Sequence, residues 1–365
     1  MLSLHVIQAE FGDCFILELK SENQSTTILI DGGPSQTFQN HLKPTLQKLD
    51  LNGNIDLMVL SHIDNDHIVG LIDLLNEIKN QRERGMKELV NIRRIWHNSF
   101  RNLLQLTEEP QNIISTFFQT QDLIKMKNIS ESIIMKGFQQ GTDLTDLAKS
   151  LNIPINQGLG KAIFVEDKVT STQLKNINLH IFGPTKKNLE KLQREWNDWF
   201  RKKQQARKSD LGLIQIFDNS VPNLASIMFL VEMKNKKILF TGDGLGRDVL
   251  DLLSKNKMLD KNGKFYVDVL KVPHHGSERN TSLEFFNTVI AEYYVISANG
   301  RDDNPSLNTL EWIIESGKTG KSPKKIILTN ITPNVKKVFE EYNQTNFNYK
   351  SIILEKKADF LTINL

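Results

Sequence analysis

The chain has 365 residues, with 46 Lys and Arg against 43 Asp and Glu, eight histidines and one cysteine, Cys14. A single thiol excludes an internal disulfide and any zinc site built from two or more cysteines, so a bound metal would be held mainly by histidines and carboxylates. The formal net charge of +3 is too small to predict a polyanionic partner by itself.

The first residues, MLSLHVIQAEFGDCFILEL, are typical of a strand rather than a secretory leader, because no basic segment precedes an apolar run. The apolar stretches are short and broken by charges, well below the roughly 18 to 20 residues that span a bilayer. We therefore expect a cytoplasmic protein without a membrane partner.

Short apolar runs in the first third predict three strands, a helix, a buried strand and a second helix, at residues 2–8, 14–19, 27–30, 38–50, 55–60 and 68–78. A further strand is expected at 92–97. A Gln-rich and predominantly helical insertion then follows over 100–160.

Strand signals return after the insertion at 161–165 and 177–182, and a basic amphipathic helix is expected over 186–208. The last third alternates strands with helices, and its strands are expected at 225–232, 237–240, 265–272, 292–297 and 358–364. Alternation on this scale predicts an α/β protein. Two halves that each run from strands to helices fit a sandwich of two sheets covered by helices, and we treat residues 1–365 as one domain.

The sharpest chemical signal is the segment SHIDNDH, residues 61–67, which follows the strand expected at 55–60. His62 and Asp64 can hold one cation while Asp66 and His67 hold a second. A pair of divalent ions about 3.5 to 4 Å apart is the arrangement of two-metal hydrolases. The alternative is a helix N-cap, in which Ser and Asp side chains accept free backbone N–H groups, but capping does not account for two flanking histidines.

Three further strand ends carry candidate ligands. The segment LFTGDG presents Asp243 on a glycine-framed turn, where a carboxylate can bridge two cations, although Asp-Gly is also common in ordinary turns. The segment VPHHGS presents His274 and His275, and because adjacent side chains point in different directions we expect one to bind metal and the other to face the substrate. His97, at the end of IRRIW, is a candidate ligand or, alternatively, a hydrogen-bonded core histidine.

In chain order, HIDNDH, the lone His97, TGD and HHGS resemble the motifs of the metallo-β-lactamase fold hydrolases. The nearest branch looks like the soluble hydrolase domain of the bacterial DNA-uptake channel protein and its free-standing relatives, since the chain also contains QAEFGDCFIL, ILIDGG, NLAS, ILFTGDG, LKVPHHGS and YYVISANGRDDNPS. The resemblance covers roughly residues 1–97 and 161–365. It implies an αββα four-layer sandwich with the metals in a cleft along one edge.

The resemblance also implies a ligand set, with the first metal ion held by His62, Asp64 and His97, the second by Asp66, His67 and His274, and Asp243 bridging the two. Asp31, in the DGG turn, would orient the loop through hydrogen bonds. The chain departs from the family at Asp64, which replaces a common histidine and makes Mn²⁺ compatible with the site as well as Zn²⁺, the expected ion. Relatives often carry Gly-His-Pro where this chain has Asp303-Asn304-Pro305, so Asn304 is a candidate for an altered substrate contact.

These residues predict a dinuclear metal-dependent hydrolase. Two divalent ions lower the pKa of a shared water from about 15.7 toward 7, so the metal-bridging hydroxide is the expected nucleophile. Asp66 would align this hydroxide while remaining a ligand, and His275 or Ser277 would stabilise the oxygens of the substrate.

A phosphodiester, with nucleic acid as one form of it, is the expected substrate. The reasons are the resemblance to the DNA-uptake branch, the oxygen-rich ligand set and the basic segment 186–208 with its two tryptophans. Phosphate contacts are predicted for Lys186, Lys187, Arg194, Arg201, Lys202 and Lys203. The alternative for this segment is a solvated amphipathic helix whose tryptophans pack on the core.

Two other functions remain open. The chain could hydrolyse a small non-nucleotide ester, thioester or amide, with the 100–160 insertion as a lid over the cleft. It could instead be a partner-binding module with a structural metal site, in which the insertion and the basic helix contact another protein.

Overall fold

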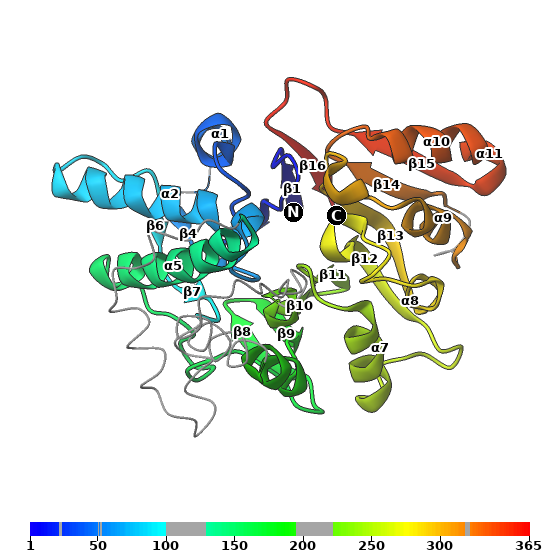
Figure 1. Ribbon diagram of the computed structural model, residues 1–365, viewed down its shortest axis with the longest axis horizontal. Coiled ribbons are helices and arrows are strands. Elements are labelled where there is room, and N and C mark those ends of the chain that lie inside the picture. The colour runs from blue at the N-terminus through cyan, green and yellow to red at the C-terminus, as the bar shows by residue number, and fades with distance from the viewer. Residues whose placement is uncertain (22–23, 50, 52, 100–128, 195–221, 318–321) are drawn as a thin grey trace, which may run out of the picture.

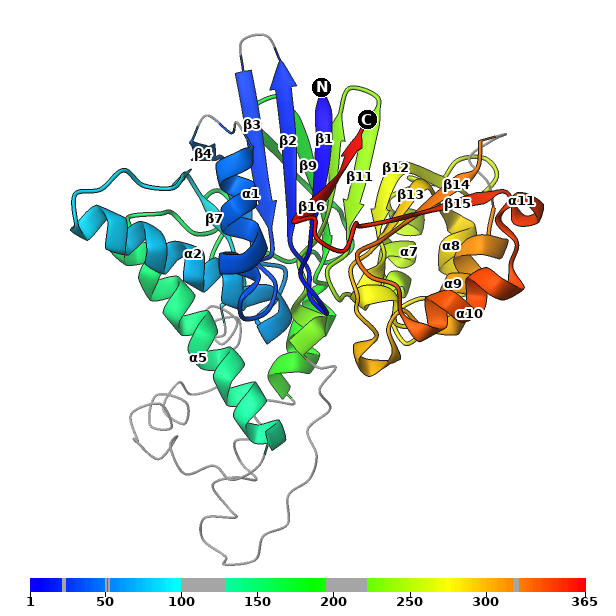
Figure 2. The same cartoon turned by 90° about the horizontal axis from the view of Figure 1, so that it is seen from above.

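The computed structural model describes residues 1–21, 24–49, 51, 53–99, 129–194, 222–317 and 322–365. Within these residues the longer strands form two sheets that face each other (Figures 1 and 2). The first sheet has the order β16 (Phe360–Asn364), β1 (Leu2–Ile7), β2 (Phe15–Ser21), β3 (Gln24–Ile30), β5 (Leu57–Val59), β7 (Ile95–Trp96). The second has the order β15 (Tyr349–Ile353), β14 (Lys324–Leu328), β13 (Val289–Ile296), β12 (Phe265–Lys271), β11 (Lys236–Phe240), β10 (Met228–Met233), β9 (Ile177–Gly183), β8 (Thr170–Leu174).

Strand direction brings several loops to one edge of the sandwich. In the first sheet β3, β5 and β7 are parallel, and in the second sheet β11 to β15 are parallel. The carboxyl ends of parallel strands meet at one sheet edge, which is where open α/β sheets bind ligands. The first and last strands pair with each other, with Ser3 opposite Asn364, so both ends of the chain belong to the same sheet.

Helices cover the outer faces of both sheets (Figure 2). On the side of the first sheet lie α1 (Lys43–Lys48), α2 (Asn65–Glu83) and α5 (Ile129–Ser150). On the side of the second sheet lie α7 (Gly246–Lys255), α8 (Leu283–Thr288), α9 (Leu307–Glu315), α10 (Pro333–Glu341) and α11 (Gln344–Phe347). This is the predicted αββα sandwich, to which a short pair of strands, β4 (Asn54–Ile55) and β6 (Asn91–Ile92), is added.

The alternation of side chains along the strands explains the layers. In β2, Phe15 and Leu17 belong to the core between the sheets, whereas Ile16 belongs to the core beneath the helices of the first sheet. Successive side chains of a strand point to opposite faces, so a strand that is apolar on both faces must be covered on both. The burial of such strands supplies the main favourable free energy of folding.

The observed elements differ from the predicted ones at two places. The strand expected at 161–165 is wrong, since Val165 forms only an isolated bridge with Thr185. Strand β8 was not predicted, because its residues, TSTQL, are mostly polar and largely exposed at the sheet edge. Within the insertion, α5 is helical as expected and lies beside α2 (Figure 1), while 100–128 lie outside the described residues.

The basic helix is described over 186–194, and 195–208 lie outside the described residues. Among the helices that the structure describes, none has the length and apolar character needed to cross a membrane.

Candidate metal centre

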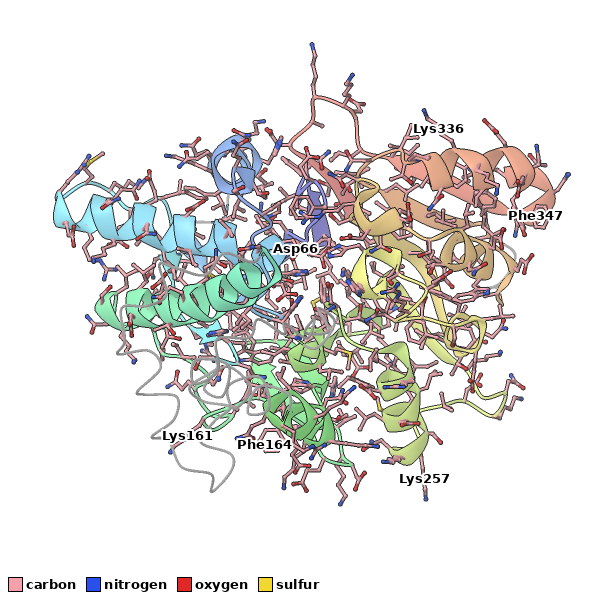
Figure 3. The ribbon with its side chains drawn as sticks, viewed as in Figure 1. Asp66, Lys161, Phe164, Lys257, Lys336 and Phe347 are labelled. Carbon is pink, nitrogen blue, oxygen red and sulfur yellow. The ribbon has the colours of Figure 1, made fainter. Side chains whose placement is uncertain are left out.

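The predicted ligands lie on loops at the carboxyl ends of parallel strands. Segment 61–67 connects β5 to α2, Asp243 follows β11, and His274 and His275 follow β12. Figure 3 shows Asp66 near the middle of the molecule, at the first turn of α2. The loops therefore bring together groups from both sheets.

Asp64 occupies the N-cap position of α2, yet its side chain accepts no capping hydrogen bond. Its Oδ2 lies 3.6 Å from Nε2 of His62. The carboxylate thus faces an imidazole rather than the free N–H groups of the helix, and the capping alternative does not explain it.

One carboxylate oxygen of Asp243 is the common neighbour of four imidazoles. Its Oδ2 lies 3.4 Å from Nε2 of His67 and 3.4 Å from Nε2 of His275. Nε2 of His274 is 3.6 Å away, and Nε2 of His62 is 3.8 Å away. This is the position that a bridging ligand requires.

Asp66 adds a second carboxylate to one side of this cluster. Its Oδ2 lies 3.4 Å from Nε2 of His275 and 3.9 Å from Nε2 of His67. Asp66, His67 and His275 therefore surround the space next to Asp243. Of the two imidazoles, that of His275 is the nearer to Asp66.

The imidazoles of His67 and His275 are held through Nδ1. Nδ1 of His275 donates to the carbonyl oxygen of Ser297 at 2.9 Å, and Nδ1 of His67 donates to Oδ2 of Asp31 at 2.9 Å. A partner of this kind fixes the tautomer and ring orientation and directs Nε2 to a metal.

Asp31 also fixes the loop that carries the ligands. Its Oδ1 accepts from the backbone N–H of Ser61 at 2.7 Å, and its Oδ2 accepts from the Ser61 hydroxyl at 2.8 Å. One buried carboxylate thereby holds both the start of the loop and the ring of His67, as the resemblance implies for this residue.

His274 and His62 have similar anchors. Nδ1 of His274 is 2.8 Å from Oδ1 of Asn280, and Nδ1 of His62 is 3.1 Å from Oγ of Ser61. His274 and His275 have successive left-handed φ angles of 47° and 54°, an uncommon backbone that turns both rings toward Asp243. Strain of this kind concentrates at functional sites.

The nitrogens that converge on Asp243 indicate whether these residues can hold a metal ion. Nε2 of His62, His67 and His275 is buried without a hydrogen-bond partner in the described part of the chain. Buried polar atoms are almost always paired, so three such nitrogens around one carboxylate need another partner. Imidazole and carboxylate together suit Zn²⁺, Mn²⁺ or Fe²⁺, and the donor set fits divalent metal ions.

The charges of the centre shift its pKa values in opposite directions. Burial would raise the pKa of Asp243, but His275, His67 and His274 hold it well below its ordinary value. The pKa of Asp66 is lowered, because His67 and His275 outweigh its burial. Burial would lower the pKa of both histidines, but Asp243 and other carboxylates raise it well above its ordinary value. In metal-free protein the protonated forms of His67 and His275 are therefore favoured and offset part of the carboxylate charge, and metal binding would release these protons.

Asp13 and Lys271 are buried charged residues that lie beside this centre, and the sequence alone assigns no role to either. Asp13, His67, Asp243 and His275 offer ligand atoms within 4.8 Å of one another. Lys271, the last residue of β12, forms an ion pair with Asp13, and its Nζ lies 3.6 Å from Oδ1 of Asp243. The available signal was a lysine closing an apolar strand, within the LKVPHHGS segment that carries the resemblance.

The loop before β2 reaches the centre because Gly12 has no side chain. A Cβ at Gly12 would lie 2.0 Å from the carbonyl oxygen of Asp66. The same oxygen accepts from the backbone N–H of Asp13 at 3.1 Å. This close approach brings Asp13 to the ligands on α2.

His97 follows β7 and lies beside helix α5. Its ring is fully buried, and a Cβ at Gly141 of α5 would lie 3.8 Å from its Nε2. Burial lowers the pKa of His97 to about 4. Among the described contacts none joins this ring to His62, Asp64 or Asp243, and the role of His97 as a ligand stays a prediction.

The predicted substrate contacts lie beside the histidine loop. Ser277 and Asn304 are both buried. The backbone N–H of Ser277 donates to the carbonyl oxygen of His274 at 2.8 Å, and Ser306 links the two loops through the carbonyl oxygen of Gly276 at 3.0 Å. Their contacts with a substrate stay a prediction.

In the basic segment, Lys186 pairs with Glu166 at 2.9 Å, and Lys187 and Arg194 are exposed. Arg201, Lys202 and Lys203 lie outside the described residues.

Comparison with known proteins agrees with the fold and the motifs. Residues 8–163 match the family model of the metallo-beta-lactamase superfamily. The match covers less than half of the chain, and the two-sheet sandwich and the ligand cluster are consistent with the fold of that superfamily. No curated protein matches the chain.

Three solved structures are similar at low identity. The metallo-beta-lactamase fold protein YhfI from Bacillus subtilis has a TM-score of 0.43 and 10% identity, with both chains covered completely. Zn²⁺-bound PqqB from Methylobacterium extorquens has a TM-score of 0.41 and 9% identity, also with both chains covered completely. CmlA, a diiron β-hydroxylase from Streptomyces venezuelae, has a TM-score of 0.40 and 10% identity, with all of this chain and 54% of CmlA covered. Likeness at this level says nothing about the substrate.

Proposed function

We propose that the chain is a dinuclear metal-dependent phosphodiesterase, with nucleic acid as one class of substrate. The observation that carries this proposal is the convergence of four imidazole Nε2 atoms on Oδ2 of Asp243. One ion would be held by His62, Asp64 and Asp243, with His274 nearby, and the other by Asp66, His67, His275 and Asp243.

When bound, two divalent ions, with Zn²⁺ expected and Mn²⁺ also compatible, supply Lewis acidity toward an ester oxygen and lower the pKa of bound water. The side chains themselves define the direction of approach. His62, His67 and Asp243 are almost completely buried, whereas the side chains of Asp64 and Asp66 are 31% and 23% exposed. Asp66 therefore lies on the open side, where its carboxylate can accept a hydrogen bond from the attacking water.

A phosphodiester is favoured by the carboxylates of the donor set and by an arginine beside an aromatic ring that is close in sequence to Asp13. Asp64, Asp66 and Asp243 supply three carboxylates, and oxygen ligands suit ions that act on phosphate esters. The exposed guanidinium of Arg301 lies 4.2 Å from the ring centroid of Phe11, two residues before Asp13. An arginine and an aromatic ring offer a phosphate contact and a stacking surface.

The basic segment is the reason to include nucleic acid. Leu189 and Leu192 are buried while Lys187 and Arg194 are exposed, so the described helical part turns cations to solvent. Such a surface would add a salt-dependent contribution to binding. A K187E/R194E variant should bind single-stranded DNA more weakly and with a shallower salt dependence, while it cleaves a small diester as well as the unmodified chain does.

The test is a substrate panel with metal-loaded protein: bis-p-nitrophenyl phosphate, single- and double-stranded DNA, RNA and a chromogenic lactam. We expect diester cleavage, its loss in Asp66→Asn, and its retention in Asp73→Asn. Asp73 lies on the same helix α2, and no described contact joins it to the centre, so it is a matched control.

Cleavage of the lactam or another non-phosphate ester alone would reject the phosphodiesterase but keep a hydrolase. A protein that holds metal and cleaves nothing would favour the partner-binding module. Fewer than one metal ion per chain after purification without chelator would count against the dinuclear centre.

A further inference from the structure

Lys271 is a buried cation at the back of the metal centre. It is 1% exposed. Its Nζ donates to the carbonyl oxygen of Gly242 at 2.9 Å and forms a close ion pair with Oδ2 of Asp13. Lysine is almost never fully buried unless it is paired, so the surrounding acceptors are the reason that it is tolerated there.

The two oxygens of Asp243 face different partners. Oδ2 faces the Nε2 atoms of the imidazoles, whereas Oδ1 lies 3.6 Å from Nζ of Lys271. Asp13 is divided in the same way, since its Oδ2 pairs with Lys271 and its Oδ1 lies 3.4 Å from Nδ1 of His275. The lysine therefore contacts the carboxylates from the side opposite the space where the ligand nitrogens converge.

The centre carries an excess of negative charge without its metals, because five carboxylates gather within it, those of Asp13, Asp31, Asp64, Asp66 and Asp243. Among the described residues, Lys271 is the one lysine or arginine that forms an ion pair with any of them. Uncompensated charge in a buried site is strongly destabilising. A permanent cation at this position lowers that cost whether or not metal is bound.

We propose that Lys271 is a positioning residue that replaces part of the metal charge in the metal-free protein. With Lys271 in place, the chain folds before it binds metal. The same lysine makes the centre hold its metal ions less tightly than it would without this positive charge. This inference rests on the proposed function, because it requires the centre to bind divalent ions.

A second buried lysine provides a matched control. Lys324 is also 1% exposed, and its Nζ donates to the carbonyl oxygens of Ile313 and Ser316, both at 2.6 Å, near the end of α9. It is the first residue of β14, at the opposite end of the parallel strands from the metal centre. A lysine that only supports the fold should stabilise metal-free and metal-loaded protein equally.

The experiment uses the full-length chain with Lys271→Met or Lys324→Met. Thermal unfolding is recorded with EDTA and with saturating Mn²⁺, and Mn²⁺ affinity is measured by competition with a chelator. Removal of a cation that repels a divalent ion across a few ångströms should lower the Kd of K271M by about tenfold or more. The Mn²⁺-induced rise in Tm should then be larger by about 2–4 °C than in the unmodified chain. K324M should have a lower Tm and an unchanged rise.

A compensating variant separates charge from packing. Asp13→Asn combined with Lys271→Met restores the net charge of the centre, so the Mn²⁺-induced rise in Tm should return close to that of the unmodified chain. If K271M cannot be recovered folded with or without metal, the double variant is compared with Asp13→Asn alone. Both variants lack the Asp13 carboxylate, which itself lies among the ligand atoms, so a larger Mn²⁺-induced rise in the double variant reports the charge of the lysine.

An equal or smaller rise in K271M, or equal rises in D13N and in the double variant, would overturn the role of Lys271 while metal binding itself stands. No rise in any variant, the unmodified chain included, would overturn both the inference and the proposed metal centre.

Discussion

Replacement of Asp31 by Asn tests whether the metal site depends on the carboxylate behind it. The carboxylate accepts from the N–H of Ser61 at 2.7 Å, from its hydroxyl at 2.8 Å and from Nδ1 of His67 at 2.9 Å. An amide has one accepting oxygen and presents an NH₂ group in place of the other. When the remaining oxygen stays with the N–H of Ser61, the Ser61 hydroxyl and the His67 ring, which share Oδ2, both lose their acceptor in Asp31→Asn.

The expected cost follows from the bonds that are lost. A hydrogen bond to a charged group contributes about 1.5–3 kcal/mol, so the metal-free variant should unfold more easily by at least that amount. Because the ring of His67 is no longer held, metal affinity should fall by about 10- to 100-fold, as for other partners of ligating histidines. Urea unfolding in EDTA measures the first effect, and titration against a competing chelator measures the second.

Asp56→Asn is the matched control. Asp56 is also buried on the first sheet, where it accepts from the N–H of Thr27 at 3.0 Å and pairs with Lys175 at 2.7 Å, at the amino-terminal end of β5. It should lose stability without losing metal affinity. If D31N and D56N hold metal equally well, Asp31 supports only the fold and the reasoning about His67 is refuted.

Further predictions concern the histidines. His275→Ala should lose more metal affinity than His274→Ala, because Nε2 of His275 lies 3.4 Å from both Asp66 and Asp243 while the side chain of His274 is 26% exposed. Metal content after dialysis measures this difference. The reverse order of metal loss would show that His274 is the ligand. His97 has its pKa lowered from 6.5 to about 4 by burial, so the stability that its neutral ring provides is present above pH 6.5 and is lost as the pH falls toward 4. In EDTA, the unmodified chain should lose about 2 kcal/mol more than His97→Gln between pH 7 and pH 5, as measured by urea unfolding; equal losses would contradict a buried neutral imidazole.

The fold could be predicted in outline because its signals are local. Apolar strands that end in polar turns, such as LMVLSHIDNDH and VDVLKVPHHGS, identify both an α/β pattern and its chemically active edge. The weak points were elements without such signals, for example the polar edge strand β8. Residues 161–165 show the opposite error, since an apolar run there forms only an isolated bridge.

The candidate site was predictable as a set of residue types rather than as a set of contacts. The motifs name His62, Asp64, Asp66, His67 and Asp243, and the structure gathers all of them. A motif does not contain the direction of a side chain, so it did not predict that the ring of His97 lies beside Gly141 of α5.

The sequence by itself determined the class of the protein, the donor types and the order of the motifs, since these depend on short-range pattern. Only the tertiary structure decided that His275 lies beside Asp66, and that Asp13 and Lys271, which are far apart in the sequence, form an ion pair behind Asp243. The physical reason is that burial and charge pairing depend on which loops meet at the sheet edge. That meeting is set by strand order and by a close approach such as that of Gly12 to α2, neither of which a local pattern encodes.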